Sequence, residues 1–303
     1  MKKEEFLQAM KSQYFGIEIE FTFITRYEAE SIVRNVLHSD DLIDSNGRQW
    51  DVVSDGSIVA KKRDAYGNVV SASSEYKCEL NSPILGYDDI GLLQEVIRAL
   101  KRGGAEASEL TGIHIHVSES GHTPKSLRCL LNLFMQKEDI FVEAFQIPDN
   151  RLFRYCNKVD EGLIRVINKR KPKTLKVLEK QWNEECGSRY RMINLESFYS
   201  NKGIEFRFFN TTFHAGVVRA YIVFCLALSQ KAKTMNRAVP KKSNMENNRY
   251  EFRNFLNRLY LSGDEFKTVR KHLLKHVSGD SSFHTPEDYG RRRLNQSLSV
   301  LLY

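Results

Sequence analysis

Two glutamates, Glu18 and Glu20, are the first residues in this sequence whose type and spacing indicate chemistry. They alternate with Ile17, Ile19 and Phe21, and such alternation predicts a half-buried strand. Both carboxylates then share one face, about 7 Å apart, while the apolar side chains enter the core. Two carboxylates on one ordered face repel each other unless a cation lies between them. The pair therefore indicates a cation site, although a glutamate pair by itself would also fit a solvated surface.

The same alternation recurs further along the chain. His114 and His116 share one strand face, Glu205 and Arg207 share another, and Glu79 lies on a short strand. Each has an ordinary structural interpretation, because a histidine can be satisfied in a core and Glu-x-Arg can form a cross-strand pair. If these strands form one sheet, however, the polar faces converge. Several carboxylates with an imidazole would bind a metal, and oxygen-rich ligation favours Mg²⁺ or Mn²⁺ over structural Zn²⁺.

The elements that must position these residues are strands and helices in mixed order. Polar turns separate the strands, so neighbouring strands can pair as hairpins. This order predicts an α+β fold, with a mainly antiparallel sheet and helices on its outer face. We expect a mobile loop over 60–74 and weakly helical, irregular chain over 148–186. The predicted strands are 14–24, 50–53, 76–80, 112–118, 189–195 and 204–211, and the main predicted helices are 25–38, 87–101, 123–145 and 217–233.

Composition restricts the protein class. The 303 residues carry a formal charge of +8, which favours anionic partners such as nucleotides or acidic peptides. The five cysteines are odd in number and none has metal-ligand spacing, as expected for a reduced, cytoplasmic protein. The first ten residues lack an apolar signal core. The apolar stretch 217–228 contains Arg219 and is too short to span a bilayer, so it predicts a buried helix and no membrane partner.

Six sequence blocks, in this order, carry a resemblance to a known family. Together they resemble the amidoligase family, which belongs to the glutamine synthetase and glutamate–cysteine ligase superfamily. The resemblance covers roughly residues 14–230, so we expect a catalytic domain at 1–230 and a helical C-terminal extension at 231–303. The blocks are FGIEIEF at 15–21, WDVVSDGS at 50–57, ELNSP at 79–83, TGIHIHV at 111–117, RYRMIN at 189–194 and IEFRFFNT at 204–211.

The resemblance implies a curved antiparallel sheet, a half-barrel like the glutamine synthetase catalytic domain, whose concave face holds Mg²⁺ (or Mn²⁺) and ATP. One metal would be held by Glu18, His114 and Glu205, near the β- and γ-phosphates. A second would be held by Glu20 and Glu79, near the carboxylate substrate. The implied nucleotide-binding residues are His116, Arg189, Arg191, Arg207 and Asn210.

The chemistry that follows is ATP-dependent joining of a carboxylate to an amine. ATP would convert the carboxylate to an acyl-phosphate, and an amine would displace phosphate to give an amide or isopeptide bond. Arg207 would stabilise the transferring phosphoryl group, and Glu205 would share its face. Asp55 or a sheet glutamate would take the amine proton, and the sequence does not choose between them.

Two other classes of protein compete with this hypothesis. His114 and His116 with Glu119 approximate a cupin-like metal site, but the long predicted helices fit a small β-barrel poorly. A non-catalytic peptide- or nucleic-acid-binding protein would use the positive charge, although no nucleic-acid-binding motif is visible. The basic segment 165–180 could contact a substrate or form a solvated surface. The sequence does not identify the acid or the amine, which could be an amino acid, a peptide or a protein.

Overall fold

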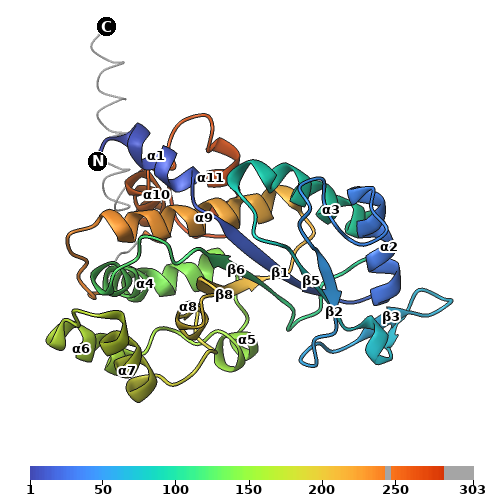
Figure 1. Cartoon of the computed structure of the whole chain (residues 1–303), viewed down its shortest axis with the longest axis horizontal. Coiled ribbons are helices and arrows are strands. Elements are labelled where there is room, and N and C mark those ends of the chain that lie inside the picture. The colour runs from blue at the N-terminus through green and yellow to red at the C-terminus, as the bar shows by residue number, and fades with distance from the viewer. Residues whose placement is uncertain (243–246, 283–303) are drawn as a thin grey trace, which may run out of the picture.

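A six-stranded antiparallel sheet forms the centre of the protein, as seen in a computed structural model that describes residues 1–242 and 247–282 (Figure 1). The strand order is β2-β5-β1-β6-β8-β7, and every neighbouring pair is antiparallel. The α+β class predicted from the sequence is therefore confirmed. The strands are β1 (Phe15–Phe21), β2 (Asp51–Val53), β5 (Cys78–Asn81), β6 (Gly112–Val117), β7 (Ile193–Asn194) and β8 (Ile204–Asn210).

Strand β1 lies near the middle of the sheet and separates a core face from a polar face. Ile17, Ile19 and Phe21 are at most 1% exposed, as their alternation predicts. Glu18 and Glu20 occupy the other face, where each meets a polar residue of a neighbouring strand. The buried side of β1 therefore fixes the register of the polar side, because a slip of one residue would exchange the two faces.

Helices cover the apolar face of the sheet. The long apolar helix α9 packs against β6 and against α1, α3, α4 and α11. Phe134 of α4 contacts Phe206 and Phe208 of β8 through ring pairs. In the described residues, α9 alone is long and apolar enough to cross a membrane, but 72% of its apolar window is buried within the protein, as in a core helix. The helices are α1 (Lys3–Lys11), α2 (Arg26–Leu37), α3 (Ile90–Arg102), α4 (Pro124–Ala144), α5 (Asp149–Arg154), α6 (Glu161–Arg170), α7 (Leu175–Glu185), α8 (Glu196–Tyr199), α9 (Ala215–Thr234), α10 (Asn248–Arg258) and α11 (Lys267–Leu273).

The predicted helix starts agree with the observed caps. Thr25 accepts the backbone N–H of Glu28, whose carboxylate accepts the Thr25 N–H at 2.7 Å. Thr123 caps α4 and Pro124 follows it at the first helical position, where a missing N–H costs nothing. These local signals define where α2 and α4 begin and so where their apolar faces meet the sheet.

Strand β8 contains a β-bulge. On either side of His114 the pairing with β6 shifts by one residue, so His114 faces both Arg207 and Phe208. The extra residue allows Phe208 and Phe209 to enter the core together, with ring centroids 4.2 Å apart. Arg207 consequently stays on the polar face of the sheet.

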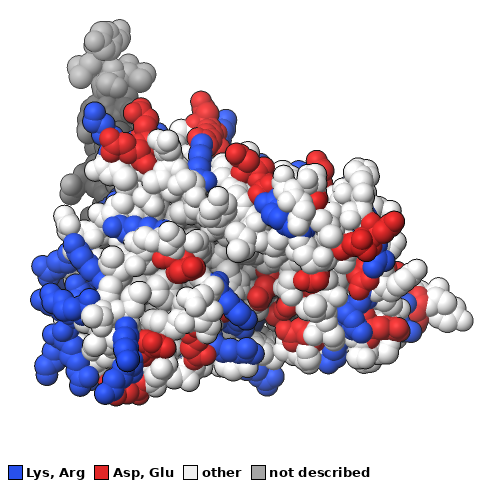
Figure 2. All heavy atoms as spheres, in the orientation of Figure 1, with Lys and Arg blue, Asp and Glu red and all other residues white. Residues whose placement is uncertain are grey.

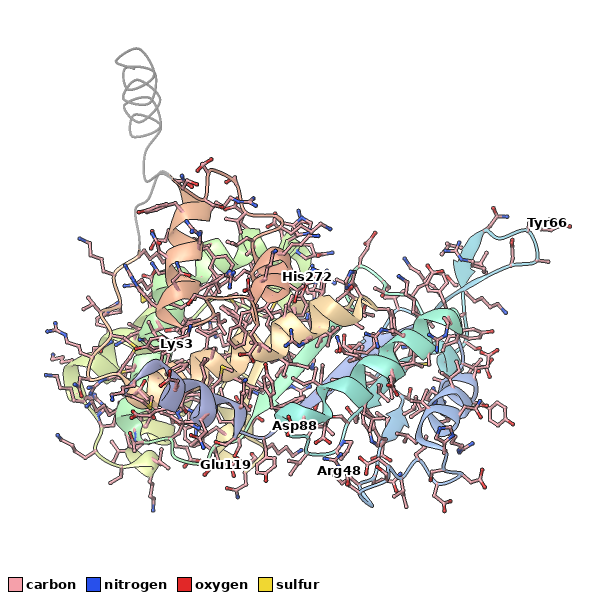
Figure 3. The ribbon with its side chains drawn as sticks, turned by 90° about the horizontal axis from the view of Figure 1, so that it is seen from above. Lys3, Arg48, Tyr66, Asp88, Glu119 and His272 are labelled. Carbon is pink, nitrogen blue, oxygen red and sulfur yellow. The ribbon has the colours of Figure 1, made fainter. Side chains whose placement is uncertain are left out.

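Three segments differ from the sequence-based expectations. The predicted loop at 60–74 contains a hairpin of β3 (Lys61–Arg63) and β4 (Val69–Ser71), and Tyr66 lies at its projecting tip (Figure 3). The segment 148–186, expected to be irregular, forms α5, α6 and α7. The strand expected at 189–195 is reduced to β7. Within the predicted helical extension at 231–303, the described residues form α10 and α11. The prediction for the residues after 282 lies outside the part of the chain that the structure describes.

Candidate active site

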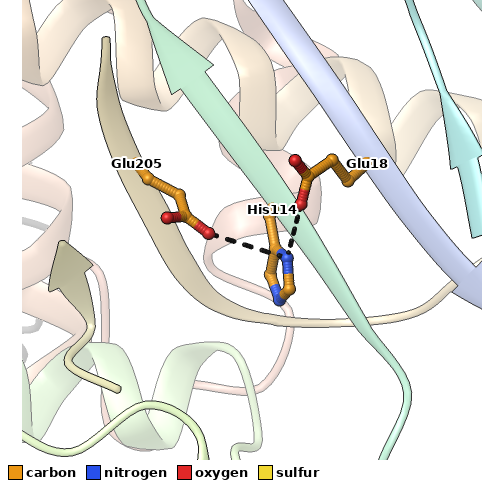
Figure 4. Close-up of side chains that lie close together, drawn as sticks. All are labelled: Glu18, His114 and Glu205. Carbon is orange, nitrogen blue, oxygen red and sulfur yellow. Dashed lines mark hydrogen bonds and ion pairs between the residues drawn. The ribbon is translucent and has the colours of Figure 1, made fainter. Parts of the chain in front are cut away.

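Three predicted metal ligands meet on the polar face of the sheet (Figure 4). Glu18 on β1 lies directly opposite His114 on β6, and Glu205 comes from β8 on the other side of β6. His114 Nδ1 lies 3.0 Å from Glu18 Oε2 and 3.7 Å from Glu205 Oε1. One donor atom from each of the three lies within 4.8 Å of the others, so this first cluster could hold one metal ion.

Two neighbouring residues orient the first cluster. His116 Nε2 lies 3.1 Å from Glu18 Oε1, while its Nδ1 lies 3.1 Å from the backbone oxygen of Lys202. That oxygen can only accept, so Nδ1 carries a proton and donates to it, while Nε2 faces a carboxylate, which favours a second proton on the ring. Asn194 on β7 donates to Glu205 Oε2 at 2.6 Å. Both contacts hold carboxylate oxygens in fixed directions before any ligand binds.

Electrostatics keep the first cluster ionised. Burial alone would raise the pKa of Glu18, but hydrogen bonds and charges from His114 and His116 hold it well below its ordinary value. The pKa of Glu205 is likewise lowered, because His114, Arg207 and His116 outweigh the effect of burial. For His116 burial opposes the charged form, yet Glu18 and Glu205 raise its pKa. Both carboxylates are therefore available as anionic ligands at neutral pH.

A second cluster lies beside the first and consists of carboxylates alone. Glu20 on β1 is directly opposite Glu79 on β5, and Asp55 approaches from the turn after β2. One oxygen from each lies within 4.8 Å of the others. The backbone N–H of Gly112 donates to Glu20 Oε2 at 2.7 Å, and that of Ser57 donates to Asp55 Oδ1 at 2.6 Å. These hydrogen bonds fix the orientation of the Glu20 and Asp55 carboxylates.

The second cluster concentrates negative charge in a partly buried position. Burial, together with the charges of Glu18, Asp55 and Glu20, raises the pKa of Glu79 to about 8. Like charges placed directly opposite each other across two strands destabilise a sheet. An all-oxygen set of this kind fits Mg²⁺ or Mn²⁺, which would remove the repulsion. The sequence resemblance implied Glu20 and Glu79 as ligands of a second metal, and the structure places Asp55 beside them.

Arg207 lies at the edge of both clusters. It forms an ion pair with Glu205 and is 8% exposed, and its guanidinium lies 5.8 Å from the ring centre of Tyr190. Its backbone oxygen accepts a hydrogen bond from Arg151 Nη2 at 3.0 Å. Arg151, on α5, is 1% exposed and also donates to Asn210 Oδ1. A buried guanidinium thus supports the strand segment that carries Arg207.

The close approach of Arg151 depends on Gly112. A Cβ at position 112 would lie 2.0 Å from Arg151 Nη2, so any side chain there would displace the guanidinium. The same glycine orients Glu20 through its N–H. Glycine within a strand commonly marks such a close approach.

Two pockets adjoin the clusters, one at each end. The smaller, of about 60 Å³, lies against the second cluster and is lined by Glu20, Asp55, Ser57, Leu110, His114, Arg151, Tyr155, Arg189, Tyr190 and Arg207. The larger, of about 420 Å³, begins at Glu18 and His116 and is lined as well by Tyr14, Phe15, Gly16, Ile17, Asn81, Ser82, Pro83, Ile84, Ser118, Glu119, Asn201, Lys202 and Gly203. The small pocket combines three guanidiniums with carboxylates, and the large one is mostly apolar.

The structure brings most of the predicted site residues together, but not all of them. Arg189 lines the small pocket, stacked on Tyr190 with its guanidinium 5.1 Å from the ring centre. Arg191 lies outside both pockets, because it pairs with Asp160 at 3.0 Å and donates to Lys158 O. Asn210 also lies outside them, because its amide donates to Phe145 O and Gln146 O while its oxygen accepts from Arg151.

Sequence reasoning missed Arg151, Tyr155 and Tyr190, and the orienting role of Asn194. Arg151 follows Pro148 in a segment with weak helical signals, and nothing local indicates that it is buried. Gly112 was the available signal, since a glycine at the start of a strand of alternating β-branched residues and histidines indicates that another group approaches closely.

This arrangement of sheet, carboxylates and arginines agrees with a family match: the chain belongs to the family described as "Putative amidoligase enzyme", which matches residues 11–229. The resemblance inferred over residues 14–230 is confirmed. A comparison with curated proteins gives no match. Among solved structures, a bifunctional glutathione synthetase from Pasteurella multocida is similar with a TM-score of 0.40 and 9% identity, covering 90% of this chain and 48% of its own. The chain thus spans about half the length of that protein.

Proposed function

We propose that this ligase joins a carboxylate to an amine at the expense of ATP, through an acyl-phosphate, to give an amide or isopeptide bond. The observation that carries the proposal is the pair of carboxylate clusters on one sheet face, with an apolar pocket at one end and an arginine-lined pocket at the other. The family match supports amide-bond formation. The clusters are what a reaction between anionic substrates requires, since phosphate and carboxylate groups must approach each other.

In this proposal the first cluster (Glu18, His114 and Glu205) and the second cluster (Glu20, Asp55 and Glu79) would each hold one Mg²⁺ or Mn²⁺ ion. When bound, these ions would neutralise phosphate and carboxylate oxygens as Lewis acids. We assign Asp55 as a metal ligand rather than as the general base, because one of its carboxylate oxygens converges with those of Glu20 and Glu79. The proton of the attacking amine would then pass to another acceptor or to water.

The protein's own residues would orient the substrates along the sheet. The pocket of about 420 Å³ suits a nucleoside, because its lining is largely apolar and its size is within the usual range for small-molecule sites. ATP would therefore enter from that end, with its phosphates passing His116. The pocket of about 60 Å³ has room for few atoms, so it suits a carboxylate or phosphoryl group between Arg151, Arg189 and Arg207.

The proposed reaction has two steps. A carboxylate oxygen of the substrate bonds to the γ-phosphorus of ATP, the bond from that phosphorus to the β–γ bridging oxygen breaks, and ADP leaves. The amine nitrogen then bonds to the acyl carbon, the bond from that carbon to the phosphate oxygen breaks, and phosphate leaves while the nitrogen loses a proton. Arg207 supplies a fixed positive charge beside the transferring group in both steps.

The wider expectations from the sequence belong to the same proposal. We propose a glutamine synthetase-like catalytic unit at 1–230, supported by the extension at 231–303, in a cytoplasmic protein. All five cysteines are free, which supports a reducing compartment. A cupin-like site is disfavoured, because the sheet is open-ended, with β2 and β7 at its edges, rather than closed into a barrel.

The test is ADP release from ATP with pools of carboxylic acids and amines, with hydroxylamine added as a small nucleophile that traps an acyl-phosphate as a hydroxamate. Turnover should require Mg²⁺ or Mn²⁺ and should vanish in Glu205→Gln. The matched control is Glu95→Gln, since Glu95 is exposed on α3. In calorimetry, ATP should bind only with a divalent ion. Equal ATP affinity in EDTA would reject the cation-bridged site.

A further inference from the structure

The strongest feature that the proposed site does not use is a concentration of positive charge on one insertion. Residues 149–192, between α4 and β7, contain twelve Lys and Arg against six Asp and Glu. This insertion thus carries +6 of the +8 charge of the chain, although it holds 44 of 303 residues. Figure 2 shows Lys and Arg gathered over the region of α6 and α7.

We define the basic face as seven exposed cations of α6, α7 and their connecting turn. They run from the middle of α6 through the connecting turn and along α7, and they are Arg165, Lys169, Arg170, Lys171, Lys173, Lys176 and Lys180. Only Lys180 pairs with an acid, Glu184 at 3.6 Å, within the part of the chain that the structure describes. Six positive charges therefore face solvent without a partner in the described chain.

Folding explains the position of only some of these charges. At the C-terminal end of α6, cations interact favourably with the helix dipole. At the start of α7 the dipole has the opposite sign, yet Lys173 and Lys176 lie there and no acidic residue occupies the first turn. Like charges packed this closely repel each other. Such an arrangement lowers helix stability and is relieved by an anionic partner.

The basic face is firmly connected to the arginine-lined pocket. The backbone N–H of Asn157, just before α6, donates to Tyr190 O at 2.9 Å, and Met192 N–H returns a bond to Asn157 O at 2.8 Å. Arg191 pairs with Asp160, the N-cap of α6, at 3.0 Å. Arg189 and Tyr190 of the pocket thus belong to the same insertion as the basic face.

Helix geometry gives the distance between the two. Helix α6 has 10 residues and leads away from Asp160, and α7 has 11 and leads back toward Arg189. At about 1.5 Å per residue, the turn between them lies about 15 Å from the pocket end of the helices. An extended peptide covers that distance with about five residues.

We propose that the basic face binds an acidic polypeptide and that this polypeptide is the carboxylate substrate of the ligase. Its Asp and Glu side chains pair with the face, and a carboxylate about five residues away reaches the pocket of Arg151, Arg189 and Arg207. A nucleic acid is the weaker fit, since segment 165–180 has no aromatic side chain on which bases could stack. The proposal rests on the proposed ligase function and names its substrate class.

The first experiment measures binding alone, in EDTA and without ATP. A fluorescent ten-residue polyglutamate peptide is titrated with the full chain and with Lys169→Gln/Lys173→Gln/Lys176→Gln. The matched control is Lys267→Gln/Lys271→Gln/Lys275→Gln, which removes three exposed cations from the region of α11. We expect about a 10-fold loss of affinity in the first variant, from three exposed ion pairs, and less than about 2-fold in the control. Equal losses in both would overturn the docking surface, as would tighter binding of a twelve-nucleotide single-stranded RNA at the same salt concentration.

The second experiment measures ADP release with polyglutamate and with small carboxylic acids as substrates. The α6–α7 variant should lose about 10-fold in kcat/KM for polyglutamate and keep its rate with small acids, because the pocket itself is unchanged. Turnover of small acids without any use of polyglutamate would overturn this inference and leave the ligase function intact. Binding of polyglutamate through the basic face with no ATP consumption under any condition would instead overturn the ligase function.

Discussion

Replacing Glu79 with glutamine tests the electrostatics of the second cluster without measuring activity. The pKa of Glu79 is about 8, against an ordinary value of 4.5, because burial and three neighbouring carboxylates oppose its charge. Because the pKa is raised in the folded state, ionisation of Glu79 does not lower the free energy of unfolding below pH 4.5. The free energy of unfolding then falls as the pH rises from 4.5 toward 8. Since pH 7 is about 2.5 units above 4.5, the free energy of unfolding at pH 7 is lowered by on the order of 3 kcal/mol. Glutamine keeps the acceptor for Asn81 Nδ2, which lies 3.1 Å away, and removes the charge.

We therefore expect Glu79→Gln to be more stable than the wild type in EDTA at pH 7, by on the order of 3 kcal/mol, or about 6 °C in Tm for a chain of this size. At pH 5 the difference should fall below about 1 kcal/mol, because pH 5 is only about half a unit above the unfolded-state pKa of 4.5. Urea unfolding and thermal melts at the two pH values measure this. Mg²⁺ should stabilise the wild type more than the variant, since the bound cation replaces the repulsion.

A less stable Glu79→Gln protein at pH 7 would refute the reasoning, because it would mean that the charged carboxylate supports the fold. An equal gain at pH 5 and pH 7 would also refute it, since the effect would then not come from ionisation. Glu95→Gln, an exposed change on α3, controls for the substitution itself and should alter stability by less than about 0.5 kcal/mol.

Further predictions concern the residues around the clusters. Arg207→Ala should lower kcat by about 10²- to 10³-fold with little change in ATP affinity, in steady-state kinetics and calorimetry; Phe206→Ala, one residue away on the core face, should destabilise by about 3–5 kcal/mol in urea unfolding. If Phe206→Ala were stable but inactive and Arg207→Ala were active, the assignment of the core and polar faces of β8 would be wrong. Gly112→Ala should cost about 3–5 kcal/mol by displacing the buried Arg151, whereas Gly91→Ala, with open space around it, should not destabilise the protein; equal melting temperatures would contradict this.

The polar and apolar faces of the central strands could be predicted from sequence, because a buried face enforces a period of two. Ile17 and Ile19 mark the core side of β1 without any knowledge of its neighbours. Glu18 and Glu20 must then lie on the opposite, polar face of the strand. What periodicity does not give is strand order, and so the sequence alone could not say that Glu20 faces Glu79 rather than a residue of another strand.

The insertion at 149–192 could not be predicted in the same way. Its helices are short and basic, so their apolar periodicity is weak, and α5 has only six residues. Arg151 is buried by tertiary packing against Gly112, which lies far away in the sequence. The position of Arg191 and Asn210 outside both pockets has a related cause, because each finds protein partners that only the folded arrangement of α4, α5 and α6 supplies.

The bulged strand β8 also has a consequence for synthesis of the chain on the ribosome. Glu18 and His114 emerge early, but Glu205 emerges only with β8, and α9, which covers the apolar face, emerges after it. Until then β6 presents an unpaired edge and the sheet an uncovered apolar face, which are features that favour aggregation. A metal ion cannot bind the first cluster at this stage, because that cluster is incomplete without Glu205. The sheet edge and apolar face must therefore be protected by the packing of the nascent chain itself or by a chaperone until α9 has been synthesised.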